Sequence, residues 1–152
     1  MILLVESNLA SDALFTNALA QFEWDLAGDG WCVLSHNVPR HIDSAWDADP
    51  QHPNPQYVAD RDLIKSIIVA DYSAAPAETK AVIILGHVTV PISGWHNPDN
   101  HGSRALPANP YYGDVDGIWT DGITFGEAVI RRGHPAEPRH HNYANDGKCD
   151  PL

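Results

Sequence analysis

The sequence predicts an α/β fold: a mostly parallel sheet of three or more strands with flanking helices, followed by long C-terminal loops. An unbroken apolar run at 81–85 (AVIIL) is typical of a strand that is buried on both faces. Residues 1–36 alternate strand, helix and strand patterns in about 35 residues, the length of a βαβ unit with parallel strands. A second helical pattern precedes 81–85, which gives the order β-α-β-α-β.

The first strand is predicted at 2–6, and Ser7 or Asn8 can cap a helix that runs from 9 to 27. The second strand is predicted at 31–36. One face of the first helix carries apolar side chains at spacings of four, three and four, namely Phe15, Leu19, Phe22 and Leu26.

Four prolines make 37–56 a loop. We expect a helix at 57–72 and the central strand of the sheet at 81–85. Ile118 to Ile123 is predicted to be a short strand or a turn, and 130–152 is predicted to lack regular structure. The apolar residues of the second helix that should face the sheet are Val58, Leu63, Ile64, Ile67 and Ile68.

Length and charge limit the function. At 152 residues the chain is predicted to form one α/β domain, truncated relative to a longer one, because about 25 structureless residues would be an unusual end for a compact domain. A net charge of −11 opposes binding to nucleic acid or anionic lipid. There is no apolar span of membrane length and no signal-peptide pattern, and the compartment stays undetermined.

The two cysteines are predicted to differ. Cys32 lies in the expected second strand, which favours a buried thiol, and Cys149 lies in the polar C-terminal segment, which favours an exposed one. A disulfide between them stays open, because spacing along the chain cannot test it.

The acidic segment at 111–121 is the first candidate for chemistry. Asp114 and Asp116 alternate around Gly117, and Asp121 follows, so several carboxylate oxygens can point at one hard cation such as Ca²⁺. The alternative is a hydrogen-bonded Asx-type turn. The segment NDGKCD at 145–150 offers the same choice between a Ca²⁺ loop and an ordinary Asp-Gly turn.

Histidines are the second candidate, because neutral imidazoles beside aspartates can bind Zn²⁺. His96 and His101 are the metal-ligand candidates, although no HExxH or CxxC spacing supports them, and exposed histidine is the alternative. A third candidate is a His87–Cys149 dyad, in which His87 follows a buried strand as a base and Cys149 is the nucleophile. The full histidine set considered is His87, His96, His101, His134, His140 and His141.

Two segments carry a family resemblance. LGHVTVP at 85–91, followed by YYGDVDG at 111–117, resembles the gingipain-type cysteine peptidase domain, in which a "leu-val-gly-asp" strand end leads through a loop to a "tyr-tyr-x-x-x-asp-gly" segment. Bacterial gingipain-like proteins show the same pattern, and the resemblance extends from Ile2 to about Asp150. It implies a caspase-like fold and, in active members, thiol-dependent proteolysis in proteins that are often secreted.

The resemblance also implies that something is missing. In that family the catalytic His-Gly and Cys come from strands beyond the acidic segment, so no residue here matches those roles by motif. Val88 stands where a glycine would follow His87, and His101-Gly102 lies in the wrong segment. The acidic loops of the family bind calcium, which supports Asp114 and Asp116 as ligands.

We therefore expect a peptidase-like domain that lacks the catalytic segment, binds a divalent cation (Ca²⁺ before Zn²⁺) and self-associates through an open sheet edge. Its natural partner would be the missing C-terminal half of the parent domain. The alternative is a small hydrolase, peptidase-like or metal-dependent, that acts from the loop 86–121.

Overall fold

The computed structural model describes residues 1–45, 49, 52–94, 105–124 and 142–151. The chain divides into two compact units. The first comprises Met1–His41 and Asp62–Thr89, and the second comprises Ile42–Arg61 and Val90–Leu152.

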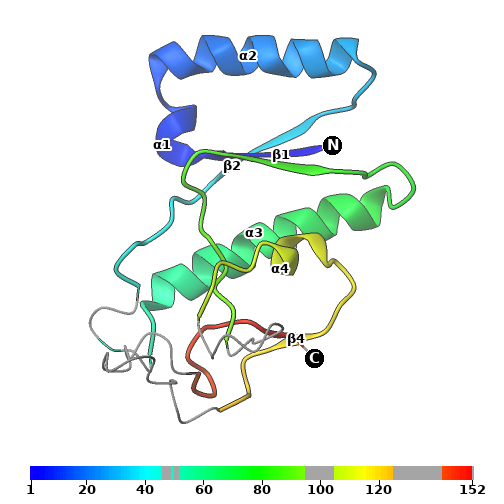
Figure 1. The fold of residues 1–152 in the computed structure, drawn as a ribbon. Coiled ribbons are helices and arrows are strands. Elements are labelled where there is room, and N and C mark those ends of the chain that lie inside the picture. The colour runs from blue at the N-terminus through cyan, green and yellow to red at the C-terminus, as the bar shows by residue number, and fades with distance from the viewer. Residues whose placement is uncertain (46–48, 50–51, 95–104, 125–141, 152) are drawn as a thin grey trace, which may run out of the picture. The chain divides into compact units, whose positions relative to one another are not determined.

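The first unit is built on a three-stranded parallel sheet (Figure 1). Its strands are β1 (Ile2–Glu6), β2 (Leu34–Val38) and β3 (Val82–Leu85), in the spatial order β2-β1-β3. The register pairs Ile2 with both Leu34 and Val82. The α/β class with an all-parallel sheet and flanking helices is therefore confirmed.

The central strand is β1, so the prediction that residues 81–85 form the central strand is wrong. The side chains of β1 are buried along its whole length, whereas β3 lies at an edge of the described sheet and Ile84 is 38% exposed. Both runs are short and aliphatic, so their patterns are alike. Only the pairing of β1 with a neighbour on each side decides which strand is central.

The first helical segment is broken, and the expected single helix at 9–27 is wrong in this respect. The structure has a short α1 (Ser7–Ala10) and a longer α2 (Ala13–Gly28). Asp12 lies between them and caps α2, since its carboxylate accepts hydrogen bonds from the backbone N–H groups of Leu14 and Phe15. The predicted apolar face of α2 is half-buried, and the helix has no fully buried residue.

The second strand begins later than predicted, at Leu34 and not at residue 31. The backbone N–H groups of Gly30 and Trp31 bond back to carbonyls of the last turn of α2, at 3.0 Å each, and Gly30 adopts a φ of +90°. This glycine-based helix end uses residues that the pattern assigned to the strand. Cys32 consequently lies before the strand and is exposed, contrary to the prediction.

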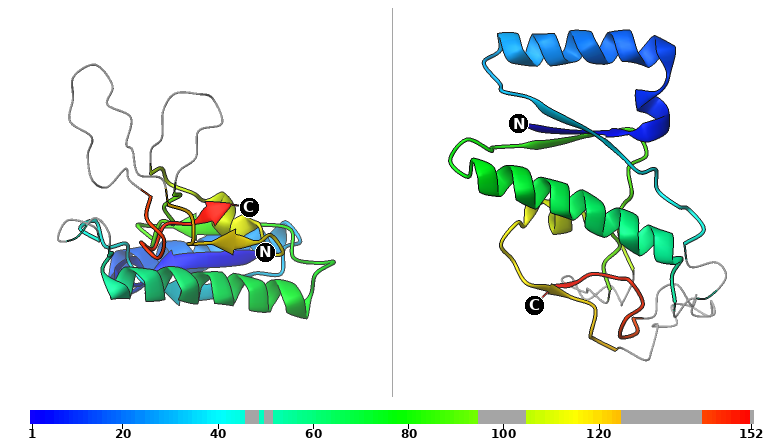
Figure 2. Two further views of the ribbon diagram at one scale, coloured as in Figure 1. Left: turned by 90° about the horizontal axis from the view of Figure 1, so that it is seen from below. Right: turned by 180° about the vertical axis from the view of Figure 1, so that it is seen from behind.

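Helix α3 (Pro55–Ala74) confirms the second helical pattern, and its residues 62–74 belong to the first unit. Within that unit, α2 and this part of α3 lie on opposite faces of the sheet (Figures 1 and 2). Ile64 and Ile68 are buried as expected, but Leu63 is 49% exposed, because it lies on the outer side of the helix. His36 of β2 and Asp71 of α3 are 2.7 Å apart.

The second unit contains α4 (Pro110–Gly113) and a short antiparallel pair, β4 (Trp119–Thr120) and β5 (Asp150–Pro151). Residues 142–151 form a bonded turn that pairs with β4, so the prediction of a structureless C-terminal segment is wrong for them. None of the helices in the described part of the chain is long and apolar enough to cross a membrane.

Candidate functional site

Polar side chains lie together at the carboxyl ends of the three parallel strands, which we call the carboxyl edge of the sheet. Glu6 ends β1, Arg40 and His41 follow β2, and His87 follows β3. Open parallel sheets place their ligands outside this edge, because side chains from neighbouring strands converge there. This edge is therefore the candidate site of the first unit.

A short antiparallel ladder fixes the geometry of this edge. Arg40 and Val88 form a bridge, and the backbone N–H of His41 donates to the carbonyl of His87 at 2.9 Å. The N–H of Thr89 donates to the carbonyl of Pro39 at 3.3 Å. His41 and His87 are therefore directly opposite each other across the ladder.

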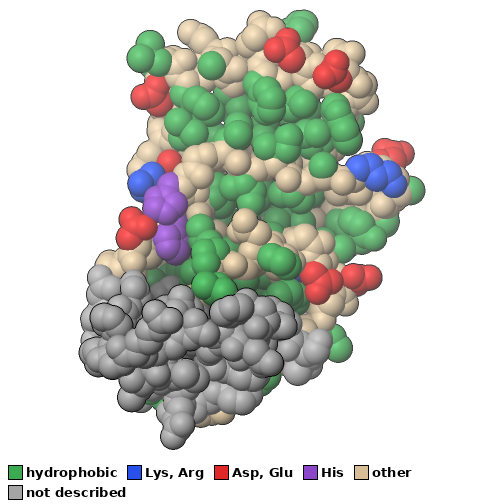
Figure 3. All heavy atoms as spheres, viewed as in Figure 1, with side chains coloured by type: hydrophobic (Ala, Val, Ile, Leu, Met, Phe, Trp, Pro, Cys, Tyr) green, Lys and Arg blue, Asp and Glu red, His purple; other side chains and the backbone are tan. Residues whose placement is uncertain are grey.

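The two imidazole rings are close neighbours. Their centroids are 5.2 Å apart with an interplanar angle of 44°, and one ring nitrogen of each lies within 4.8 Å of one on the other. Both side chains are half-buried, and the surface view shows histidine side chains grouped on the face that it presents (Figure 3). Two adjacent imidazoles can share a proton or bind one metal ion.

A partly buried ion pair joins the ends of β1 and β2. One carboxylate oxygen of Glu6, whose side chain is 4% exposed, is 3.3 Å from the guanidinium of Arg40, and the other accepts the N–H of Asn8 at 2.8 Å. Gly86 permits this packing: its φ is +87°, and a Cβ there would lie 2.8 Å from the Cβ of Glu6. Glycine thus brings the β3 end close to β1 just before His87.

Among the residues predicted for catalysis, only His87 lies at this edge. Cys149 belongs to the second unit, where it is buried and its sulfur lies 3.6 Å from the guanidinium of Arg61. The expectation of an exposed Cys149 is wrong, because backbone bonds with Ile92 and Gly94 draw the turn that carries it inward.

The acidic segment forms the turn that was the alternative to a calcium loop. The carboxylate of Asp114 accepts the backbone N–H of Gly117 at 3.0 Å and the indole N–H of Trp119 at 2.9 Å. Asp116 is exposed. Within the described ranges, Asp114, Asp116 and Asp121 do not form a group that could hold one ion together.

Asp121 instead holds the C-terminal turn. Its two carboxylate oxygens accept the backbone N–H groups of Asp146 and Gly147, at 3.0 and 2.8 Å. Burial raises the pKa of the Asp121 carboxyl, and the nearby carboxylates of Asp146 and Asp150 raise it further, while the two N–H bonds lower it. The 145–150 segment thus forms a bonded Asp-Gly turn, in which Gly147 has a φ of +77°.

Beneath this turn lies a buried polar network. The Lys148 ammonium is paired with the Asp146 carboxylate, and both side chains are almost completely buried. The Asn142 amide donates to Asp150 at 2.8 Å, while its own Oδ1 is buried and has no hydrogen-bond partner among the described residues. This network has a structural role, since its bonds close the turn onto itself.

The predicted metal ligands His96 and His101 lie outside the described residues, as do His134, His140 and His141. Those predictions stay predictions.

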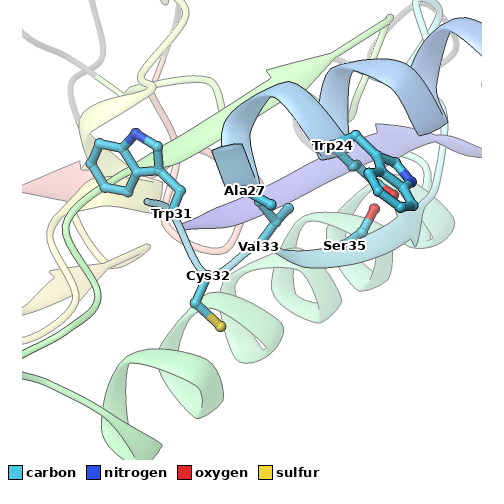
Figure 4. A pocket seen from close by; sticks show the side chains of 7 residues that line it. Trp24, Ala27, Trp31, Cys32, Val33 and Ser35 are labelled. Atoms are coloured by element: carbon cyan, nitrogen blue, oxygen red, sulfur yellow. The ribbon is translucent and has the colours of Figure 1, made fainter. Parts of the chain in front are cut away.

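An open, mostly apolar pocket of about 490 Å³ lies between α2 and the start of β2. Ala27 and Val33 face each other in it, with Trp24 over Ser35 (Figure 4). Its lining residues also include Cys32, which is exposed, but none of the residues predicted for a site. It lies toward the amino end of β2, whereas His41 and His87 follow the carboxyl ends of β2 and β3.

The sequence analysis missed Glu6, Arg40 and His41. A signal for them existed, because each one ends or closely follows an apolar run that was predicted to be a strand. Considering the residues after all three strands together, and not only those after 81–85, would have found them. The pairing of His41 with His87 could not be found this way, since it depends on the ladder beyond the strands.

Comparison of the chain with protein-family models, with curated proteins and with solved structures gives no match.

Proposed function

We propose that this chain is a peptidase-like α/β domain that does not catalyse hydrolysis by itself, because none of its residues matches the catalytic His-Gly and Cys motifs of the gingipain-type family. The observation that supports this proposal is the position of the thiols. His87 follows the carboxyl end of β3, whereas Cys32, the only cysteine of the first unit, precedes β2. Because the strands are parallel, His87 and Cys32 lie at opposite ends of the strands.

The burial of Cys149 gives further support. A nucleophilic thiol must be reachable by its substrate and be present as the thiolate. The side chain of Cys149 is only 2% exposed, and its backbone N–H and carbonyl both take part in hydrogen bonds that hold the turn in place. A substrate carbonyl could reach this sulfur only if the turn opened.

The test is turnover by the purified chain on a panel of peptide and ester substrates, with His87→Ala and Cys149→Ala as variants. We expect no hydrolysis above the buffer rate for any of the three proteins. Turnover by the wild-type chain that either substitution abolishes would overturn the proposal.

The alternative function is a small hydrolase, peptidase-like or metal-dependent, acting from 86–121. It is favoured by the position of His87 at the sheet edge where α/β enzymes place their general bases. Turnover that survives Cys149→Ala, but is lost with His87→Ala or with EDTA, would select this alternative and identify it as metal-dependent or histidine-dependent.

The proposal also includes a calcium site at Asp114, Asp116 and Asp121, on the ground that carboxylates alternate around Gly117. Binding would require the side chains of Asp114 and Asp121 to leave the hydrogen-bonded turns described above and to converge with Asp116 on the ion. Thermal melts with CaCl₂ and with EDTA test it. We expect a higher Tm with CaCl₂ in the wild type and a smaller rise in Asp116→Asn, which removes an exposed carboxylate. An identical Tm in CaCl₂ and in EDTA would contradict the calcium site, and the segment would then be a hydrogen-bonded turn that binds no ion.

The proposal also includes self-association through a sheet edge. Within the described sheet, β2 and β3 each pair on one side only, and an edge strand can accept another strand. Light scattering over a range of concentrations should show a dimer that Ile84→Lys, on β3, converts to a monomer. Ile118→Lys is the control, because Ile118 is 69% exposed and lies in the second unit. A monomer at all concentrations would contradict this part.

A further inference from the structure

We propose that His41 and His87 together bind a divalent transition-metal ion through their imidazole nitrogens, with solvent completing the coordination. The site would accept Cu²⁺, Ni²⁺ or Zn²⁺ and reject Ca²⁺ and Mg²⁺. It differs from the proposed calcium site in the acidic segment, because it uses other residues and another ligand chemistry, and it shares only His87 with the residues considered for catalysis.

The backbone places the two histidines opposite each other. His41 and His87 are opposite each other in the ladder that Arg40 and Val88 form, and the 2.9 Å bond from His41 N–H to the His87 carbonyl holds them there. Side chains of directly opposed residues leave a ladder on the same face with their Cβ atoms about 4.5–5.5 Å apart. The fold thus aligns two imidazoles before any ion arrives.

The two rings are close to the separation that one metal ion requires. Nitrogens bound to one ion at about 2.0–2.1 Å are about 3–4 Å apart, depending on the coordination angle. The ring nitrogens of this pair lie within 4.8 Å of each other, and the rings are tilted by 44°. Rotation about the side-chain bonds closes the remaining gap without movement of the backbone.

The ligand type determines which ions are accepted. Imidazole nitrogen suits Zn²⁺, Cu²⁺ and Ni²⁺, whereas Ca²⁺ and Mg²⁺ require oxygen ligands. Glu6, at the end of β1, is 3.3 Å from the Arg40 guanidinium, which balances its charge. With two protein ligands, the affinity should follow the order Cu²⁺ above Ni²⁺ and Zn²⁺.

Protonation competes with the ion. Imidazole binds metal only in its neutral form, so acid should release the ion. Within the first unit, Glu6 and Arg40 lie at the same end of the strands and are paired with each other.

The experiment is calorimetric titration of the purified chain with NiCl₂ and with ZnCl₂ at pH 7.5, using His41→Gln and His87→Gln. His52→Gln is the matched control, because His52 is an exposed histidine of the second unit beside Asp49. We expect each of the first two variants to lose one binding equivalent that the control keeps. Titration of the wild-type chain with CaCl₂ should show no heat of binding at the His41–His87 site.

A second measurement needs no variant. Substoichiometric Ni²⁺ should broaden the amide NMR signals of residues 39–41 and 87–89 of the wild-type chain before all others, and lowering the pH to 5.5 should restore them. The proposal is overturned if broadening starts elsewhere. It is also overturned if both Gln variants, folded by circular dichroism, keep the full number of equivalents.

Discussion

Gly86 shows how a single residue determines the geometry of the candidate site. Its φ of +87° is a conformation that side chains with a Cβ rarely adopt, and the Cβ of Glu6 would lie 2.8 Å from an added methyl group. Because Glu6 ends the central strand, its Cβ cannot move without moving β1. A glycine at this position therefore keeps the ends of β1 and β3 together.

Gly86→Ala is expected to destabilise the chain by about 1–3 kcal/mol, through backbone strain and the clash with Glu6. Gly28→Ala is the control: Gly28 ends α2, no atom lies within 4 Å of an added Cβ, and the change should be neutral or stabilising. Urea denaturation of both variants measures the difference. Equal midpoints would contradict the close approach of β1 and β3.

Lys148 and Asp146 are the second case at this scale, because both charges are buried and depend on each other. Lys148→Met should cost about 3–5 kcal/mol, since it leaves the Asp146 carboxylate buried without its cation. The double variant Asp146→Asn/Lys148→Met removes both charges and should recover part of that loss. The measurement is again the urea midpoint, and a double variant no more stable than the single one would argue against the pair.

Among the elements, β1 has the role that the sequence pattern assigned to β3. The two strands are register partners, since Leu4 of β1 pairs with Ile84 of β3. Leu4 is completely buried and Ile84 is 38% exposed. The apolar pattern of each strand predicts that strand, but which strand is central depends on which strands pair with it.

Truncation of these register partners tests the order of the strands. Leu4→Ala should destabilise the chain by about 2–5 kcal/mol, because it leaves a cavity in the core. Ile84→Ala should cost at most about 1–2 kcal/mol, because part of that side chain already contacts solvent. Thermal or urea unfolding compares the two. A larger cost for Ile84 would restore residues 81–85 as the central strand.

At the scale of the whole molecule, the chain forms two compact units with different means of stabilisation. The first depends on a parallel sheet between helices, as its apolar patterns predict. The second depends on polar contacts and buried phenols: the Tyr57 hydroxyl donates to the Val90 carbonyl at 3.0 Å and accepts the Ile92 N–H at 3.1 Å. These contacts join segments that are far apart in the sequence.

The buried phenols give the stability of the chain a dependence on pH. Burial raises the pKa of both Tyr57 and Tyr112 above the ordinary value of 10.0. The folded state therefore keeps two protons that the unfolded state releases as the pH rises past 10.0, and stability should fall above that pH. We expect these two phenols to ionise only as the circular dichroism signal of the fold is lost.

Ultraviolet absorption of tyrosinate, recorded with circular dichroism over this pH range, measures the effect. Tyr112→Phe should remove one of the phenols that ionise with unfolding, while Tyr72→Phe is the control on α3. Ionisation of all tyrosines before any loss of the fold would show that the two phenols are not buried in solution.

The sequence by itself determined the α/β class, the parallel strands and α3. These follow from the period and length of apolar runs, which are local properties of the chain. It also placed His87 at the end of a strand, and it offered the Asx-type turn at Asp114 as one of two alternatives.

Only the tertiary structure decided that β1 is central, that Cys149 is buried, and that His41 lies opposite His87. Each of these depends on contacts between segments distant in sequence: the pairing of β1 on both sides, the inward turn at 142–151, and the ladder between 39–41 and 87–89. A local pattern contains the propensity of a segment but not the identity of its neighbours, and neighbours determine both burial and the grouping of side chains into a site.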